Sequence, residues 1–177
     1  MSSPGQAPVE RPRPRVVLVG PPGAGKTTIA ALLAAHWGVT ARDTDADIEE
    51  LEGRSVSDIF IEAGEAHFRV AEAAAVASAL AEHDGVLALG GGAVLDPNTR
   101  ALLADHTVVF LKVGLSDSVK RVGLGTTRPL LLGNVRSRVK ALLDERAPLY
   151  ESVATLSVET DGREPADIVE EIIEALS

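Results

Sequence analysis

A glycine-rich segment near the N-terminus, residues 20–27, constrains the fold of this chain more than any other feature. It reads Gly-Pro-Pro-Gly-Ala-Gly-Lys-Thr and satisfies the pattern Gly-x-x-x-x-Gly-Lys-Ser/Thr. The apolar, β-branched run 16–19 precedes it, and apolar residues at helical spacing follow it to about Trp37. A strand that ends in such a loop and leads into a helix is the setting in which this pattern binds phosphate groups. The alternative is a glycine-rich turn before an ordinary helix.

The chemistry of this loop is that of an anion site. Glycines let several backbone N–H groups point inward, and the N-terminus of the helix adds about half a positive charge. We expect Lys26 to reach the β- and γ-phosphates of a nucleotide and the Thr27 hydroxyl to bind Mg²⁺. The predicted nucleotide contacts in this segment are Gly23, Ala24, Gly25, Lys26, Thr27 and Thr28.

Predicted strands and helices alternate along the chain, which is typical of an α/β sandwich around a mainly parallel sheet. The predicted strands are 16–19, 39–42, 86–89, 107–113 and 156–159. The predicted helices are 26–37, 45–51, 56–61, 65–82, 97–103, a helix after Ser116, 136–145 and 166–176. We expect one domain over residues 15–177, a flexible proline-rich tail at 1–14 and a mobile lid at about 123–135.

Parallel sheets bind ligands at the carboxyl ends of their strands. Three segments follow predicted strands there: the phosphate loop, Asp43 to Asp45, and the triple glycine 90–92. Alternate residues of an extended chain face the same side, so Asp43 and Asp45 are predicted to enter one cleft. One carboxylate can hold Mg²⁺ through water and the other can accept a proton from an attacking hydroxyl. Alternatively, Asp45 caps the next helix, or the Asp-x-Asp spacing is that of an unrelated metal site.

Arginines supply the positive charge that an anionic substrate needs. Arg69 and Arg146 can each bind a carboxylate through a bidentate fork, and Arg128 can close over the phosphates. Arg69 and Arg146 are alternatively surface residues in weak ion pairs, and Arg128 is alternatively a solvated loop residue. The glycines 90–92 can donate backbone N–H groups to a ligand, or they form a loop that needs positive φ.

Composition excludes several classes of protein. The formal net charge is −9, and such a surface repels nucleic acid and anionic membranes. Cysteine is absent, so a disulfide framework and a thiolate metal site are excluded. No apolar run approaches the roughly 20 residues of a membrane span, and the tail is not a secretory signal. One domain leaves room for a nucleotide and a small co-substrate, so a cytoplasmic, monomeric small-molecule kinase is expected.

Taken together, these segments resemble the shikimate kinase family from Arg15 to about Leu176. The telling segments are 20–28, 43–45, Gly-Glu-Ala-His-Phe-Arg (64–69), Leu-Gly-Gly-Gly-Ala-Val (89–94), Arg-Pro-Leu-Leu (128–131) and Arg-Ala-Pro-Leu-Tyr (146–150). The resemblance implies transfer of the γ-phosphoryl of ATP to the 3-hydroxyl of shikimate, in aromatic amino-acid biosynthesis. It also implies the nucleoside-monophosphate-kinase-like fold, a phosphate-loop NTPase fold with a five-stranded parallel sheet in the order 2-3-1-4-5.

The resemblance further implies a role for each matching position. Thr27 would bind Mg²⁺ and Asp43 its water shell, while Asp45 would bind the shikimate hydroxyls and act as the base. Arg69 and Arg146 would bind the shikimate carboxylate, Gly91 and Gly92 would donate backbone N–H groups, and Phe60 and Phe68 would form the apolar wall of the shikimate pocket. Lys26 and Arg128 would stabilise the transferring phosphoryl group. The positions that would flank adenine are Arg121, Arg163 and Pro165.

Two other functions compete with this interpretation. A kinase of the same fold that acts on gluconate would also need arginines for a carboxylate. Degraded phosphate-loop residues would favour a nucleotide-binding module without turnover, whereas here Lys26, Thr27 and both aspartates are intact.

Overall fold

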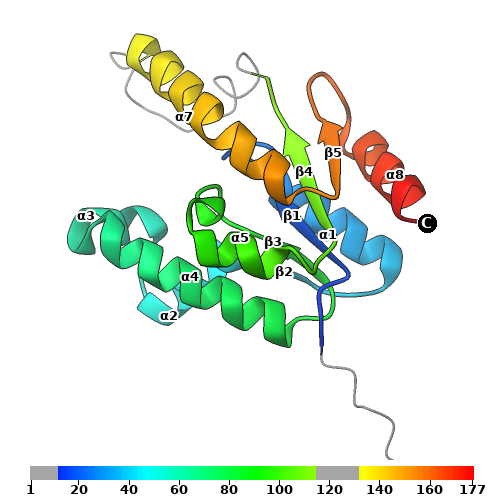
Figure 1. The fold of residues 1–177 in the computed structure, drawn as a ribbon, viewed down its shortest axis with the longest axis horizontal. Helices are drawn as coiled ribbons and strands as arrows, with labels where there is room; N and C mark the ends of the chain where they lie inside the picture. The colour runs from blue at the N-terminus through cyan, green and yellow to red at the C-terminus, as the bar shows by residue number, and fades with distance from the viewer. Residues whose placement is uncertain (1–11, 115–131) are drawn as a thin grey trace, which may run out of the picture.

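The structure is a computed structural model that describes residues 12–114 and 132–177. Its centre is a parallel sheet of five strands in the order β2-β3-β1-β4-β5, which confirms the predicted order (Figure 1). The central strand β1 pairs with β3 on one side and β4 on the other, with Val17 opposite Leu87 and Val108. The strands are β1 (Val16–Val19), β2 (Ala41–Asp43), β3 (Val86–Ala88), β4 (Val108–Lys112) and β5 (Leu156–Glu159).

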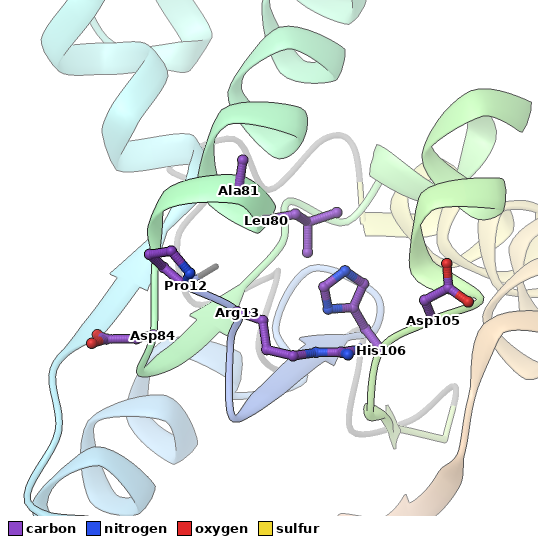
Figure 2. A pocket seen from close by; sticks show the side chains of 7 residues that line it. All are labelled: Pro12, Arg13, Leu80, Ala81, Asp84, Asp105 and His106. Atoms are coloured by element: carbon purple, nitrogen blue, oxygen red, sulfur yellow. The ribbon is translucent and has the colours of Figure 1, made fainter. Parts of the chain in front are cut away.

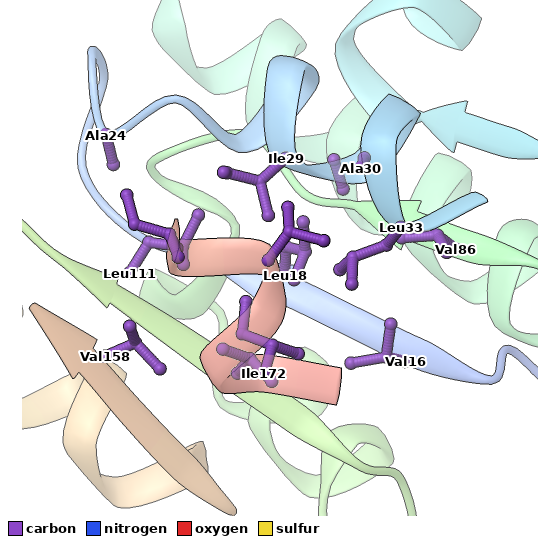
Figure 3. Close-up of a cluster of buried hydrophobic side chains, with 14 of the residues drawn as sticks. Val16, Leu18, Ala24, Ile29, Ala30, Leu33, Val86, Leu111, Val158 and Ile172 are labelled. Carbon is purple, nitrogen blue, oxygen red and sulfur yellow. The ribbon is translucent and has the colours of Figure 1, made fainter. Parts of the chain in front are cut away.

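Helices α1 (Lys26–Trp37) and α8 (Pro165–Leu176) cover one face of the sheet. Val16 and Leu18 point toward these helices, and Ile172 of α8 packs in the same buried cluster (Figure 3). The central strands β1 and β3 are buried along their whole length, as strands of a parallel sheet covered on both faces usually are.

The opposite face of the sheet packs against a second cluster, to which Val17 and Val19 contribute. The alternation along β1 therefore divides its four apolar residues between two cores. The elements on this face are α4 (Glu65–Glu82), the 3₁₀ helix η1 (Ala93–Leu95), α5 (Pro97–Leu103) and α7 (Leu132–Val153) (Figure 1).

A third, smaller core joins α2 (Thr44–Glu52), α3 (Val56–Ala63) and α4. It contains Ile48, Ile59 and Phe68, one residue from each helix. These helices form a unit beside the carboxyl edge of β2 and β3, and this unit carries Phe60, Phe68 and Arg69 to the predicted site.

Helix α7 corrects two sequence predictions. It begins at Leu132, inside the predicted lid, and it continues to Val153, beyond the predicted end at residue 145. Pro148 lies inside the helix and removes one backbone donor there. The helix continues because Tyr150, in its last turn, is buried against the sheet. Residues 1–11 of the predicted tail, the helix after Ser116 and the lid at 123–131 lie outside the described residues.

Adjacent leucines on α1 provide a test of this packing. Leu33 is fully buried in the first cluster, whereas Leu32 is 40% exposed. We expect Leu33→Ala to lower the free energy of unfolding by about 2–5 kcal/mol, because it leaves a cavity. Leu32→Ala, on the same helix with the same helix propensity, should cost less than about 1 kcal/mol. Urea denaturation measures both, and equal losses would contradict the assigned packing.

Candidate active site

The phosphate loop connects β1 to α1 at the carboxyl edge of the sheet. Lys26 folds back across it, and its Nζ donates hydrogen bonds to the carbonyl oxygens of Gly20 at 2.7 Å and Pro21 at 3.1 Å. Burial lowers the pKa of Lys26 to about 8, against the opposing charges of Asp45 and Asp43. The loop borders a cleft of about 310 Å³ lined by Pro22, Gly23, Gly25, Lys26, Thr27, Thr28, Asp43, Asp45, Leu89 and Gly91.

Asp43 links the start of α2 to the start of α1. Its Oδ1 accepts a hydrogen bond from the Asp45 N–H at 2.8 Å, which caps α2, and its Oδ2 accepts one from the Thr27 hydroxyl at 3.2 Å. Both aspartates do enter the cleft, but the predicted reason was wrong. Strand β2 ends at Asp43 and Asp45 lies in the first helical turn, so the cap at Asp43, and not strand alternation, places the second carboxylate.

Asp45 is a carboxylate in an unfavourable position. Its Oδ1 is buried and has no hydrogen-bond partner among the described residues. Burial raises the pKa of Asp45 to about 6, with further increases from the negative charges of Asp43 and Glu72 and a partial offset from Lys26. A buried acceptor without a donor costs free energy, so this oxygen is suited to a ligand that brings a hydroxyl.

The glycine loop after β3 docks closely on this carboxylate. The Gly90 N–H donates to the buried Thr44 hydroxyl at 3.1 Å. A Cβ atom on Gly90 would lie 2.5 Å from Asp45 Oδ1, and one on Gly92 would lie 2.1 Å from Arg69 Nη1. Side chains at these two positions would displace the aspartate or the arginine, so the absence of Cβ atoms here is a requirement of the site.

Arg69 is held by a buried carboxylate that the sequence analysis missed. Its Nη1 donates to Glu72 Oε1 at 2.7 Å, and Glu72 is only 3% exposed. Burial raises the pKa of Glu72, although Arg69 and Arg146 lower it in part. An acidic residue three positions after Arg69 in an alanine-rich helix was the signal that could have identified it, because residues i and i+3 share a helix face.

Two aromatic rings form an apolar surface beside Arg69. The ring centroids of Phe60 and Phe68 are 4.6 Å apart, and the Arg69 guanidinium carbon lies 5.4 Å from the Phe68 centroid and 5.9 Å from that of Phe60. The rings limit the rotamers of Arg69 and give the site one apolar side, as expected for Phe60 and Phe68.

Arg146 reaches the same region from α7. Its Nε is buried without a partner among the described residues. Its charge lowers the pKa of Lys26, of Glu72 and of Tyr150, as a cation near these groups does. Arg146 therefore belongs to the same group of charges as Glu72, the partner of Arg69. Tyr150, which the sequence analysis left without a role, lies beside them.

Two of the predicted adenine contacts, Arg163 and Pro165, lie apart from this group of charges. Arg163 donates to the carbonyl oxygens of Glu159 at 2.9 Å and Asp167 at 3.3 Å, and it pairs with Glu171 at 3.3 Å. It and Pro165 lie in and just after the β5–α8 connection, on the carboxyl edge of the sheet but outside the cluster of charges described above. Arg121 and Arg128 lie outside the described residues.

A larger hollow, of about 950 Å³, occupies the opposite, amino edge of the sheet (Figure 2). Arg13 and His106 lie in it, with Asp84 and Asp105 at its sides. Burial and the charge of Arg13 lower the pKa of His106, which makes the ring neutral near pH 7. None of the predicted site residues lines this hollow, so its volume does not make it the active site.

Residues 12–114 and 132–177 contain no group of three or more His, Asp or Glu side chains that could cage a metal ion. The contact between Thr27 and Asp43 is nonetheless suitable for Mg²⁺, which keeps several waters and takes other ligands from phosphates. The helices within those residues also lack the combination of length and apolar character that a bilayer span requires.

Known proteins are similar to this chain in both sequence and fold. A family model described as shikimate kinase matches residues 22–177. The shikimate kinase of Thermobifida fusca is 57% identical over 164 residues, which cover 93% of this chain and 95% of that protein. A solved structure of shikimate kinase from Acinetobacter baumannii in complex with shikimate superimposes with a TM-score of 0.86 at 33% identity, and covers 93% of each chain.

A gluconokinase structure from Sinorhizobium meliloti covers 94% of this chain and 93% of its own, with a TM-score of 0.56 and 21% identity. This likeness shows a shared fold alone. The family model and the identity to the Thermobifida protein, in contrast, extend over nearly the whole sequence and include the residues that form the cleft. The chain therefore belongs to the shikimate kinase family.

Proposed function

We propose that this protein transfers the γ-phosphoryl group of ATP to the 3-hydroxyl of shikimate, giving shikimate 3-phosphate and ADP. The observation that carries the proposal is a pair of buried atoms, Asp45 Oδ1 and Arg146 Nε, that have no hydrogen-bond partner within the described part of the chain. One is an acceptor and the other a donor. A hydroxy acid supplies the complementary hydroxyl and carboxylate to the two.

The nucleotide side of the reaction belongs to the phosphate loop. The backbone N–H groups of residues 23–28 and the Lys26 ammonium bind the phosphates, and phosphate oxygens replace the carbonyls of Gly20 and Pro21 around Nζ. Thr27 and Asp43 would hold Mg²⁺, which supplies charge neutralisation at the phosphates. Phosphate charge also restores the protonated form of Lys26, whose pKa burial has lowered.

The acceptor side uses the other edge of the cleft. Asp45 orients the attacking hydroxyl and accepts its proton, and a pKa near 6 suits a base that operates at neutral pH. Arg69 and Arg146 bind the carboxylate as bidentate donors, while Gly91 and Gly92 offer backbone N–H groups and Phe60 and Phe68 contact the ring. Glu72 fixes the angle of the Arg69 fork.

The remaining assignments belong to the same proposal. Arg128 stabilises the transferring phosphoryl group, and Arg121, Arg163 and Pro165 flank the adenine. The protein acts as a cytoplasmic monomer in the route to the aromatic amino acids. The net charge of −9 argues against nucleic acid and anionic membranes as partners.

The direct test is a coupled ADP-release assay on the purified protein with Mg²⁺ and ATP. We expect turnover with shikimate and none above background with gluconate, because the two arginines, the glycine amides and the aromatic wall enclose one compact acid. Lys26→Met should abolish turnover and serves as the control for contaminating kinases. Turnover with gluconate and not with shikimate would overturn the proposed function, and hydrolysis of ATP without an acceptor would contradict a kinase.

The pH dependence follows from Asp45. Because the base must be ionised, kcat/KM for shikimate should fall as the pH drops through about 6, which is the pKa of Asp45 in the free protein. Asp45→Asn should lower kcat by about a hundredfold or more and remove this acidic limb from the residual activity. An Asp45→Asn protein with an unchanged acidic limb would assign the titration to another group.

The same substitution should stabilise the free protein. The folded state raises the pKa of Asp45 from 3.8 to about 6, so the native protein binds this proton more tightly than the unfolded chain. The free energy of unfolding therefore decreases as the pH rises between those values and stays lower above them. At pH 7.5 we expect Asp45→Asn to be more stable by on the order of 1 kcal/mol, since solvent partly screens the charge. The gain should disappear below about pH 4 in urea denaturation.

A further inference from the structure

We propose that Tyr150 is a positioning residue for the acid substrate, because its hydroxyl ties helix α7, which carries Arg146, to the glycine loop that carries Gly91 and Gly92. The inference rests on the proposed function and deepens it. It assigns a task to a side chain that touches neither nucleotide nor acceptor in the mechanism described above.

The first half of the tie is a hydrogen bond from the Tyr150 hydroxyl to the carbonyl oxygen of Gly91. The bond joins residues 59 positions apart, from α7 and from the loop after β3. Tyr150 is 1% exposed, and its ring packs on Phe110 of β4 with centroids 5.0 Å apart. The contact between the two rings fixes the position of the hydroxyl, since a buried phenol that packs against a strand of the central sheet has little freedom to move.

Peptide geometry gives this bond a consequence in the substrate site. The peptide between Gly91 and Gly92 is planar and trans, so its carbonyl and its N–H point in opposite directions. Because Tyr150 holds the Gly91 carbonyl, it also directs the Gly92 N–H away from the phenol. The N–H groups of Gly91 and Gly92 have no acceptor within the part of the chain that the structure describes, so a ligand can use both. Glycines have no side chain that could fix this peptide by itself.

The second half of the tie is Arg146, one helical turn before Tyr150 on α7. The phenol is buried, which raises the pKa of Tyr150, while the positive charge of Arg146 acts in the opposite direction. The guanidinium therefore lies near the phenol, whose hydroxyl donates to Gly91. Arg146 Nε has no partner among the described residues, so it remains available as a donor to the substrate carboxylate.

The two contacts have a joint effect on the site. Arg146 lies on α7, whereas Arg69 and the glycines 91–92 lie on elements packed beside β3. A substrate that is gripped by both groups is sensitive to the distance between them, and misplacement by a fraction of an ångström weakens binding. Tyr150 joins the helix that carries Arg146 to the glycine loop through its hydrogen bond to the Gly91 carbonyl.

Tyr150→Phe tests the tie, because it keeps the ring packing and removes only the hydroxyl. We expect KM for shikimate to rise about five- to tenfold, because the variant loses a buried hydrogen bond and with it the fixed orientation of the Gly91–Gly92 peptide. KM for ATP should change by less than about twofold. Thr160→Val is the matched control. It removes another buried hydroxyl that donates to a backbone carbonyl, that of Lys112 at 2.7 Å, and should leave KM for shikimate unchanged. A Tyr150→Phe protein with the KM of the control, or with both KM values raised equally, would overturn the tie.

A second measurement does not depend on a variant. The chain contains a single tyrosine, so 3-fluorotyrosine incorporated throughout labels position 150 alone. We expect saturating shikimate to shift its ¹⁹F resonance, as Arg146 turns to the substrate, and ADP alone to shift it less. A resonance unmoved by shikimate, in protein that turns shikimate over, would overturn the tie even if Tyr150→Phe fails to fold. Absence of turnover in the wild-type protein would instead count against the proposed function.

Discussion

The site depends on balancing buried charge at one edge of a parallel sheet. Lys26, Arg69 and Arg146 face Asp43, Asp45 and Glu72, so the cleft is close to neutral before any substrate enters. The balance is imperfect in detail, since Asp45 Oδ1 and Arg146 Nε are left without partners among residues 12–114 and 132–177. In the proposed function, these two atoms cost stability in the free protein and gain partners when a hydroxy acid binds, which is a common relation between stability and function at active sites. A triphosphate then adds negative charge that three cations cannot neutralise, and this explains why Mg²⁺ and further arginines belong to the proposal.

In this fold, the residues that stabilise the protein are largely different from those assigned to ligand binding. The two large cores on the faces of the sheet are apolar, and none of the six charged residues named above belongs to them. Tyr150 belongs to the second of these cores. The third core, between α2, α3 and α4, is small, and it borders the aromatic wall and Arg69. A small core opens at lower free energy than a large one, so the elements to which the proposed function assigns the hydroxy acid are those that can adjust to it.

The sheet order came from the resemblance to a known family, whereas the convergence of three loops could be predicted from strand ends and glycine-rich turns, which are local signals. The helix 65–82, predicted from helix propensity, has the bounds of α4. Prediction from the sequence failed where long-range packing decides. The extent of α7 depends on the burial of Tyr150 beyond Pro148, which helix propensity does not reveal. The position of Asp45 depends on a cap by Asp43, where the strand ends one residue later than expected.

The residues that the sequence left without a role share one property: each acts on a catalytic or binding group through a second protein atom. Glu72 acts through Arg69, Thr44 through Gly90 and Tyr150 through Gly91. A motif identifies side chains that meet the ligand, because their chemistry is that of the ligand's partners. It does not identify the side chains that aim them, because a buried phenol or hydroxyl at such a position has the same appearance in sequence as one that only fills space. Their contribution becomes visible only when the peptide groups that they hold are seen to have N–H groups without an acceptor among the described residues, which is the geometry found at Gly91 and Gly92.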